Sequence, residues 1–257
     1  MLTSLKQVVK KTPLCIPFII AKGLITQPRA QNDEAFILHR LLRRYEVPKR
    51  FLEFGFSGWE FNCAALVRDW DGLLVDGDEY NVRIARLIYP RIQARALWLT
   101  LDSLGSLMDY ATAAPLGILS VDVDGNDYWF LERLIVSKPA LIIAEYNSSF
   151  GLRPITVPYD PGFDRTRKHA TWTYYGASLT AIDHLARRNG YSLIEISNSG
   201  VNAFFIRDDF LTADDLVLSP STSFREKLFL DGSRPAGQWE RIKQLPFVDV
   251  RDMTVWA

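Results

Sequence analysis

The sequence predicts an α/β fold in which a mostly parallel sheet carries helices on both faces and closes with an antiparallel hairpin. Apolar runs end at five evenly spaced points, at Phe54, Asp76, Thr100, Asp122 and Glu145. Two later β-rich runs then flank an Asn-Ser-Gly turn, at residues 191–196 and 201–206. Five strands, each followed by a helix, and a terminal hairpin give a seven-stranded sheet.

The spacing of the five apolar runs fits repeated strand–helix units. Successive strand ends are 22, 24, 22 and 23 residues apart, which leaves room for one strand, one helix and two short loops. The runs are continuously apolar, as expected for parallel strands that are covered on both faces. The third strand is expected at residues 96–100, the fourth at 116–121 and the fifth at 140–144.

Residues 51–78 are central to this prediction because they read as strand, glycine turn, helix and strand. The helix is expected at residues 60–68, between two buried strands. Gly55 and Gly58 bracket a turn where the backbone can approach a ligand closely. Asp76 follows Gly55 by 21 positions, close to the ~20-residue spacing at which nucleotide-binding units place an acid for a ribose hydroxyl. A strand–helix–strand unit without a ligand gives the same pattern.

A helix over residues 34–45 is expected before the first strand. Asn32 or Asp33 can cap it, because each offers a side-chain oxygen to the free amides of the first turn. Its buried positions are expected to be Phe36, Ile37, Leu41 and Leu42. Residues 1–30 form a lead-in whose apolar run is too short for a membrane span. We expect this lead-in to pack on the domain or to rest on a membrane surface.

After the fifth strand the regular spacing ends. Residues 147–169 form a long loop rich in proline and glycine. Because loops of this length are often functional, we expect a lid or a substrate loop. A helix follows at residues 179–189, before the hairpin. The domain is expected to span residues 31–207, with residues 208–257 as a helical tail packed on it.

Composition limits the classes of function. The 257 residues are 48% hydrophobic and 23% charged, values typical of a globular domain. Lys and Arg balance Asp and Glu at 30 each, so no overall charge favours nucleic acid, and no nucleic-acid partner is expected. Two cysteines, Cys15 and Cys63, are too few for a disulfide framework or a structural zinc site. A cytoplasmic location is expected, and the oligomeric state is left open.

Acidic side chains gather at the ends of the fourth and fifth strands. Asp122, Asp124 and Asp127 fall within six residues, and Glu145 and Asn147 follow the next strand. Neighbouring parallel strands bring these ends together. Clustered carboxylates repel one another, so they need a cation, a proton or a hydrogen bond from a substrate.

Three interpretations of this cluster remain open. Asp124 or Glu145 can act as a general base that takes a proton from a substrate hydroxyl. Alternatively, Mg²⁺ can be held by Asp124 or Asp122 together with Glu145 and Asn147, since it prefers oxygen ligands. The metal would then acidify and orient the acceptor hydroxyl. In the third interpretation residues 126–127 only cap a helix, and one acid bonds loop amides.

Seven short motifs carry a resemblance to a known family: QNDE at 31–34, EFG at 53–55, VDG at 75–77, VDVDGNDYW at 121–129, EYN at 145–147, GASL at 176–179 and GVNAFF at 200–205. With the strand layout, they resemble the class I S-adenosylmethionine-dependent methyltransferases, whose seven-stranded sheet ends in a reversed last strand. More narrowly, the chain resembles the FkbM-like methyltransferases over residues 31–207. Its glycine loop departs from the usual G-x-G-x-G pattern, because only Gly55 and Gly58 remain.

The resemblance implies a Rossmann-like fold, S-adenosyl-L-methionine as cofactor, and methyl transfer to a hydroxyl of a sugar or secondary metabolite. The acceptor would be a small molecule or a glycan. The implied cofactor site consists of Glu53, Gly55, Gly58, Asp76, Asp102 and Asp122. Its methionine end would lie along the glycine loop, its ribose hydroxyls at Asp76 and its adenine end near Asp102. A plain helix cap explains Asp102 equally well.

His169 in the long loop is a further candidate base, because an unperturbed histidine pKa suits proton transfer. An exposed loop histidine more often has no such role. Two other functions compete with methyl transfer. The Asp-Val-Asp-Gly acids at 122–125 resemble motifs of metal-dependent phosphatases and glycosyltransferases, although three strands precede them. The glycine-poor loop would also suit a catalytically degenerate methyltransferase fold that serves as a binding module.

Overall fold

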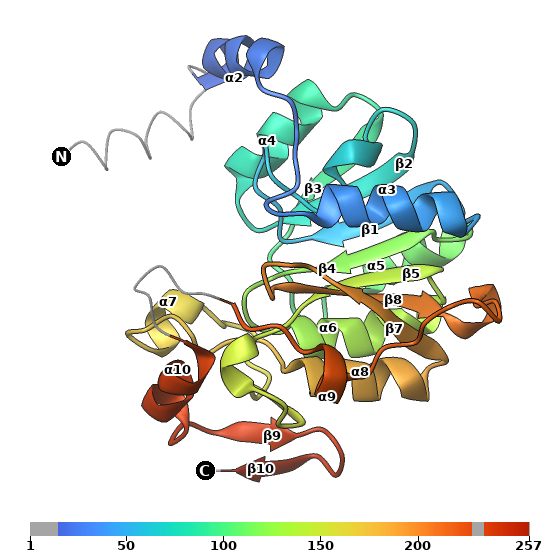
Figure 1. The fold of residues 1–257 in the computed structure, drawn as a ribbon. Helices are drawn as coiled ribbons and strands as arrows, with labels where there is room; N and C mark the ends of the chain where they lie inside the picture. The colour runs from blue at the N-terminus through green and yellow to red at the C-terminus, as the bar shows by residue number, and fades with distance from the viewer. Residues whose placement is uncertain (1–14, 228–233, 257) are drawn as a thin grey trace.

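A seven-stranded sheet forms the centre of the molecule (Figure 1). The structure is a computed structural model that describes residues 15–227 and 234–256. The strands of this sheet are β1 (Arg50–Phe54), β2 (Asp71–Asp76), β3 (Ile92–Ala96), β4 (Ile118–Val121), β5 (Leu141–Glu145), β7 (Tyr191–Ile196) and β8 (Asn202–Arg207). Their order is β3-β2-β1-β4-β5-β8-β7. Strand β8 is antiparallel to both of its neighbours, and the other pairs are parallel. The predicted Rossmann-like, mostly parallel sheet with a closing hairpin is confirmed.

Helices cover both faces of this sheet. They are α3 (Glu34–Arg44) and α4 (Glu79–Ile88) on one face, and α5 (Gly105–Ala113), α6 (Asp127–Leu134) and α8 (Leu179–Arg188) on the other. Adjacent strand residues point into opposite layers: Phe51 packs with the first group of helices and Leu52 with the second. The continuous apolar runs therefore supply two cores, as expected for a sheet covered on both sides.

The third strand ends four residues earlier than expected. Strand β3 lies at the edge of the sheet, and only Ile92 and Ala94 of its five residues are buried. Because buried and exposed residues alternate along β3, this strand does not form the continuous apolar run by which the other strands were predicted. The continuous run that follows, at residues 97–99, lies outside the sheet.

The helix expected at residues 60–68 is also wrong. This segment contains a single 3₁₀ turn, Ala64–Leu66. The amides of Asn62 and Cys63 donate to the buried carboxylate of Glu53, at 2.6 and 2.9 Å. These bonds hold the segment against β1 instead of letting it extend as a helix.

Helix α3 forms as predicted, but its contacts differ from the expected ones. Phe36 is 69% exposed, whereas Leu38 is fully buried. Asp33 occupies the N-cap position without bonding the first turn. Its carboxylate accepts a hydrogen bond from the Asn198 amide in the hairpin turn, so a tertiary partner replaces the expected cap.

The C-terminal segment contains strands as well as helices, which corrects the expected helical tail. Strands β9 (Phe247–Asp249) and β10 (Thr254–Trp256) join β6 (Ile155–Thr156) in a second antiparallel sheet. Helices α9 (Pro220–Ser223) and α10 (Pro235–Ile242) precede them. Because β6 belongs to the long loop, the loop and the tail stabilise each other through one core, formed by residues such as Phe150, Ile242 and Phe247.

Part of the lead-in is a helix, α2 (Cys15–Ile25), that packs on α4 (Figure 1). The fully buried Ile19 contacts Ile84, which confirms packing on the domain. Residues 1–14 lie outside the described part of the chain. Within the described residues, we find no helix with the length and apolar character needed to cross a bilayer.

Phe247→Ala tests whether the tail is part of the folded domain. Phe247 is 1% exposed, and its ring lies 5.1 Å from Phe150 and 5.3 Å from Tyr174. We expect the free energy of unfolding, measured in urea, to fall by about 3–5 kcal/mol because a cavity forms. Val255→Ala on the exposed β10 is the control and should change it by less than about 0.5 kcal/mol. Equal values for the two variants would contradict the packing described.

Candidate functional site

A cavity of about 440 Å³ opens at the C-terminal ends of the parallel strands. It is lined by residues at or just beyond the ends of four neighbouring strands, at 55–57, 75–78, 97–99 and 122–124. The chain builds the sheet outward from β1 to β3 and then returns to place β4 on the other side of β1. Open α/β sheets bind ligands at such a switch point, and the volume falls within the ~300–1,000 Å³ typical of small-molecule sites.

Gly55 brings the loops after β1 and β4 into direct backbone contact. Its φ is +71°, and a Cβ at this position would lie 1.4 Å from the carbonyl oxygen of Asp122. Both facts restrict the position to glycine. Gly58 has a different role from the one predicted, because a Cβ there would meet the side chain of Ile84 at 2.6 Å. It allows α4 to pack closely and does not line the cavity.

Asp76 lies at the end of β2 and lines the cavity, where the sequence placed it. One of its carboxylate oxygens accepts hydrogen bonds from the Asp78 amide and the Asn81 side chain, at 2.6 and 3.3 Å. Burial raises the pKa of Asp76. Asp102 is exposed and does not line the cavity. It also does not cap α5, whose first residue is preceded by Leu104 with no side-chain cap.

Aromatic residues that the sequence analysis did not assign to a site form the apolar wall of this cavity. Trp98 lies against Gly77, and its ring nitrogen donates to the carbonyl of Pro161 at 2.8 Å. Phe163 of the long loop packs against Gly125. The sequence signal for this wall is the continuous apolar run after β3. This run is not part of the sheet and lines the cavity instead.

A second cavity of about 260 Å³ adjoins the first. The two share Gly55, Ser57, Asp122 and Asp124 as lining residues. The second cavity is strongly polar, since five acidic and two basic side chains line it: Glu53, Glu60, Asp122, Asp124, Glu145, Arg165 and Lys227. The larger cavity therefore combines aromatic residues with four aspartates, whereas charged side chains of both signs line the second one, called the acidic cavity below.

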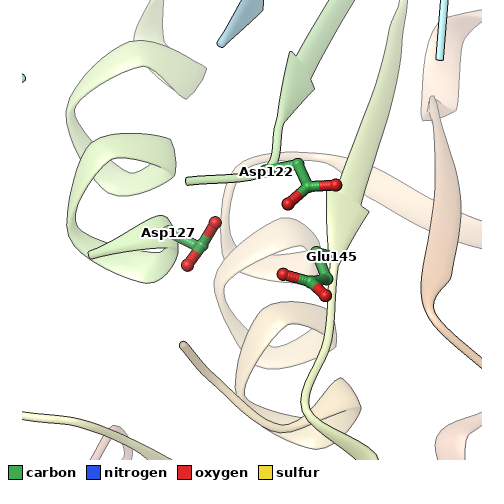
Figure 2. Close-up of side chains that lie close together, drawn as sticks. All are labelled: Asp122, Asp127 and Glu145. Carbon is green, nitrogen blue, oxygen red and sulfur yellow. The ribbon is translucent and has the colours of Figure 1, made fainter. Parts of the chain in front are cut away.

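Three carboxylates converge at this wall (Figure 2). Asp122 follows β4, Asp127 begins α6 and Glu145 ends β5, and one oxygen of each lies within 4.8 Å of the others. Burial and the charge of Glu145 raise the pKa of Asp122 well above its usual range. Burial, with Asp124 and Asp127 nearby, raises the pKa of Glu145 to about 8. The cluster thus needs a proton or a cation.

Asp127 and Glu145 differ in how many hydrogen bonds their carboxylates accept. Asp127 accepts from the amides of Val123 and Gly125, at 2.7 and 2.8 Å, and burial raises its pKa to about 6. The predicted role of one acid in bonding loop amides is therefore confirmed. The predicted cap is wrong, because Asn126 precedes α6 without a side-chain cap bond and Asp127 bonds amides that lie before the helix. Glu145 is 5% exposed; its Oε1 accepts from the Tyr175 hydroxyl at 3.3 Å, and its Oε2 has no hydrogen-bond partner within the described chain.

Asp124 has a positive φ of 56° and forms an ion pair with Arg165 of α7 (Arg165–Lys168). The guanidinium of Arg165 also stacks on the Tyr175 ring, 4.0 Å from its centre. Glu53, predicted at the methionine end, lines only the second cavity. Burial raises the pKa of Glu53 to about 7, and both of its oxygens bond the loop after β1.

Two predicted residues are engaged outside the cluster. The side-chain amide nitrogen of Asn147 donates to the carbonyls of Thr173 and Tyr175, and its oxygen accepts from the Ser149 amide. Asn147 therefore fixes the loop after β5, and it is not one of the converging ligands. The Nδ1 of His169 lies 2.8 Å from the Thr171 hydroxyl, and His169 lines neither cavity.

Some solved structures are similar in fold to this chain. No family model and no protein with a curated description matches the chain. The N-terminal domain of EvdMO1 with S-adenosylhomocysteine (SAH) bound is 15% identical, with a TM-score of 0.43 over 69% of this chain and 80% of that one. A methyltransferase from Geobacter sulfurreducens in complex with S-adenosyl-L-homocysteine is 16% identical, with a TM-score of 0.39 over 70% and 72%. At these values the likenesses assign neither family nor activity.

Gly55→Ala tests the backbone contact at the shared wall. We expect the free energy of unfolding to fall by at least about 2 kcal/mol, because alanine meets both a positive φ and the Asp122 carbonyl. Gly105→Ala is the matched control: its Cβ would meet nothing within 4 Å, and a helical Gly→Ala change should be neutral or stabilising by up to about 1 kcal/mol. Wild-type stability in Gly55→Ala would mean that the two loops can separate freely.

Proposed function

We propose that the chain is an S-adenosylmethionine-dependent methyltransferase that transfers a methyl group to a hydroxyl oxygen of a small-molecule or glycan acceptor. The observation that carries this proposal is the pair of adjoining cavities with a common wall at Gly55 and Asp122. Methyl transfer needs a donor and an acceptor that meet end to end, with water excluded between them. The reversed strand β8 adds an analogy at the level of the fold.

The larger cavity is the proposed cofactor site. Asp76 offers a carboxylate for the ribose hydroxyls, and Trp98 and Phe163 offer aromatic surface for a purine. Residues 55–57 would lie along the methionine end. When bound, the cofactor supplies a methyl group on a positively charged sulfur. Asp102, exposed and outside the cavity, is a weaker candidate for the adenine end than Trp98.

The acidic cavity is the proposed acceptor site. There the acceptor hydroxyl would face the methyl group that the bound cofactor would supply. The hydroxyl proton must leave, and Glu145 is the proposed recipient because its Oε2 has no other partner. Asp124 is a second candidate, although Arg165 already pairs with it. His169 stays a prediction that requires movement of its loop.

Instead of taking up a proton, the acidic cluster can hold Mg²⁺. The donor set fits, since Asp122, Asp127 and Glu145 present hard oxygen ligands close together, and Glu145 Oε2 has no competing bond. We therefore propose these three residues in place of the predicted set with Asp124 and Asn147. A cation here would orient the acceptor hydroxyl and lower its pKa.

Calorimetric titration with S-adenosylhomocysteine tests the cofactor site. We expect the wild-type chain to bind it and Asp76→Ala to bind at least about tenfold more weakly, a loss of about 1.4 kcal/mol. Asn81→Ala is the control, because it removes a neighbour of Asp76 but keeps the carboxylate. A wild-type chain that binds no nucleoside would contradict the proposal. Metal binding without nucleoside binding would favour a phosphatase or glycosyltransferase, and binding of neither would favour a degenerate binding module.

A Mg²⁺ titration distinguishes the two roles of the acidic cluster. If the cluster holds the metal, we expect Glu145→Gln and Asp122→Asn to abolish the binding heat. Asp124→Asn should keep it, because Asp124 is not among the converging ligands. Thermal unfolding of each variant checks the fold. The absence of Mg²⁺ binding by the wild-type chain would contradict the metal site and leave Glu145 as the proton acceptor.

A further inference from the structure

Helix α2 presents an apolar face that the domain does not cover. Phe18, Ala21 and Ile25 recur at the i, i+3 and i+7 spacing of one helix face, and all three are exposed. Phe18 is 63% and Ile25 85% exposed, and Ile20, which points to another side of the helix, is 47% exposed. Exposed apolar surface concentrated on one element marks an interaction site more often than scattered single residues do.

The opposite face of α2 fixes its orientation on the domain. Ile19 is fully buried against α4, and Gly23 lies so close to Ile88 that a Cβ would be 2.3 Å from its side chain. The Lys22 ammonium lies 4.9 Å from the centre of the Trp59 ring. In Figure 1, α2 lies beyond α4 at the outer edge of the molecule. The apolar face is therefore held outward.

The N-terminal part of the sequence is basic. The first 32 residues contain five Lys or Arg and no Asp or Glu, so the rest of the chain has 25 basic and all 30 acidic residues. A groove of about 360 Å³ beside α2 is lined by Arg68 and Arg91 and by no acidic residue. The whole chain has no net charge, but its first 32 residues are basic by sequence, and Arg68 and Arg91 lie in the groove next to α2.

We propose that α2 docks on an anionic membrane surface, with its apolar face at the boundary between headgroups and acyl chains and with Arg68 and Arg91 of the neighbouring groove toward the lipid phosphates. Apolar burial and electrostatic attraction to anionic lipid are the two terms that hold interfacial helices. A second copy of the chain fits less well, because a symmetric contact would place the same cations opposite one another.

This docking goes beyond the proposed methyl transfer and does not depend on it. The two are close in space, because Gln31, six positions after Ile25, lines the acidic cavity. Six extended residues span at most about 20 Å. The docked helix would therefore hold the acidic cavity near the lipid surface, where an acceptor carried by a lipid would be within reach.

Co-sedimentation of the full chain with vesicles tests the docking. We use phosphatidylcholine alone and phosphatidylcholine with about 30 mol% phosphatidylglycerol. We expect binding at least about tenfold tighter to the anionic vesicles, and release at about 0.5 M salt. The double variant Phe18→Asp/Ile25→Asp should lose binding, and Arg68→Gln/Arg91→Gln should weaken it several-fold. Leu216→Asp, at a position 76% exposed in the tail, should bind like the wild type.

Three results would overturn the proposal: no wild-type binding to anionic vesicles, equal binding to both vesicle types, or unchanged binding by the double variant. A dimer in light scattering that Ile25→Asp dissociates, without any vesicle binding, would assign the face to a second copy instead. The substituted side chains are exposed, so the fold should persist, and circular dichroism melting checks this. Ile25→Asp alone serves if the double variant is unstable.

Discussion

The close approach of two backbone segments at Gly55 and Asp122 determines the arrangement of the site. Only a residue without a Cβ fits where the Gly55 loop meets the Asp122 carbonyl. This contact joins the ends of β1 and β4, which lie at the switch point of the sheet. Residues on the two loops form the wall between the larger cavity and the acidic cavity. Of the two glycines in this loop, Gly55 makes the contact with Asp122, and Gly58 packs against Ile84.

Burial of charge is the second constraint. Asp122 and Glu145 end adjacent strands, so the sheet itself forces two carboxylates together. Two close, like-charged groups, Glu145 buried and Asp122 half-buried, cannot both remain ionised without compensation. The structure compensates part of this cost through the loop amides that bond Asp127 and the Tyr175 hydroxyl that bonds Glu145. One oxygen of Glu145 is left without a hydrogen-bond partner among the described residues.

The sequence predicted the features that depend on periodicity and failed where tertiary contacts decide. The regular spacing of apolar runs located four of the five parallel strands, and the Asn-Ser-Gly turn located the hairpin. The edge strand β3 was predicted at the wrong residues because its exposed positions interrupt the apolar run. For the same reason Trp98 was assigned to the strand and was not predicted to line the cavity. Asp76, Asp122 and Glu145 were found because strand ends converge. Two other contacts join segments that are distant in the sequence: Asn147 bonds Thr173 and Tyr175, and β6 pairs with β9. Neither contact produces a local pattern in the sequence from which it could be predicted.

A crystal structure of the chain soaked with S-adenosylhomocysteine is the most direct test of the central claim. The account predicts the nucleoside in the larger cavity, with its ribose hydroxyls at Asp76, its base beside Trp98 and its sulfur toward the wall shared by Gly55 and Asp122. Nucleoside density at any other place on the molecule, or the sulfur directed away from the acidic cavity, would contradict it.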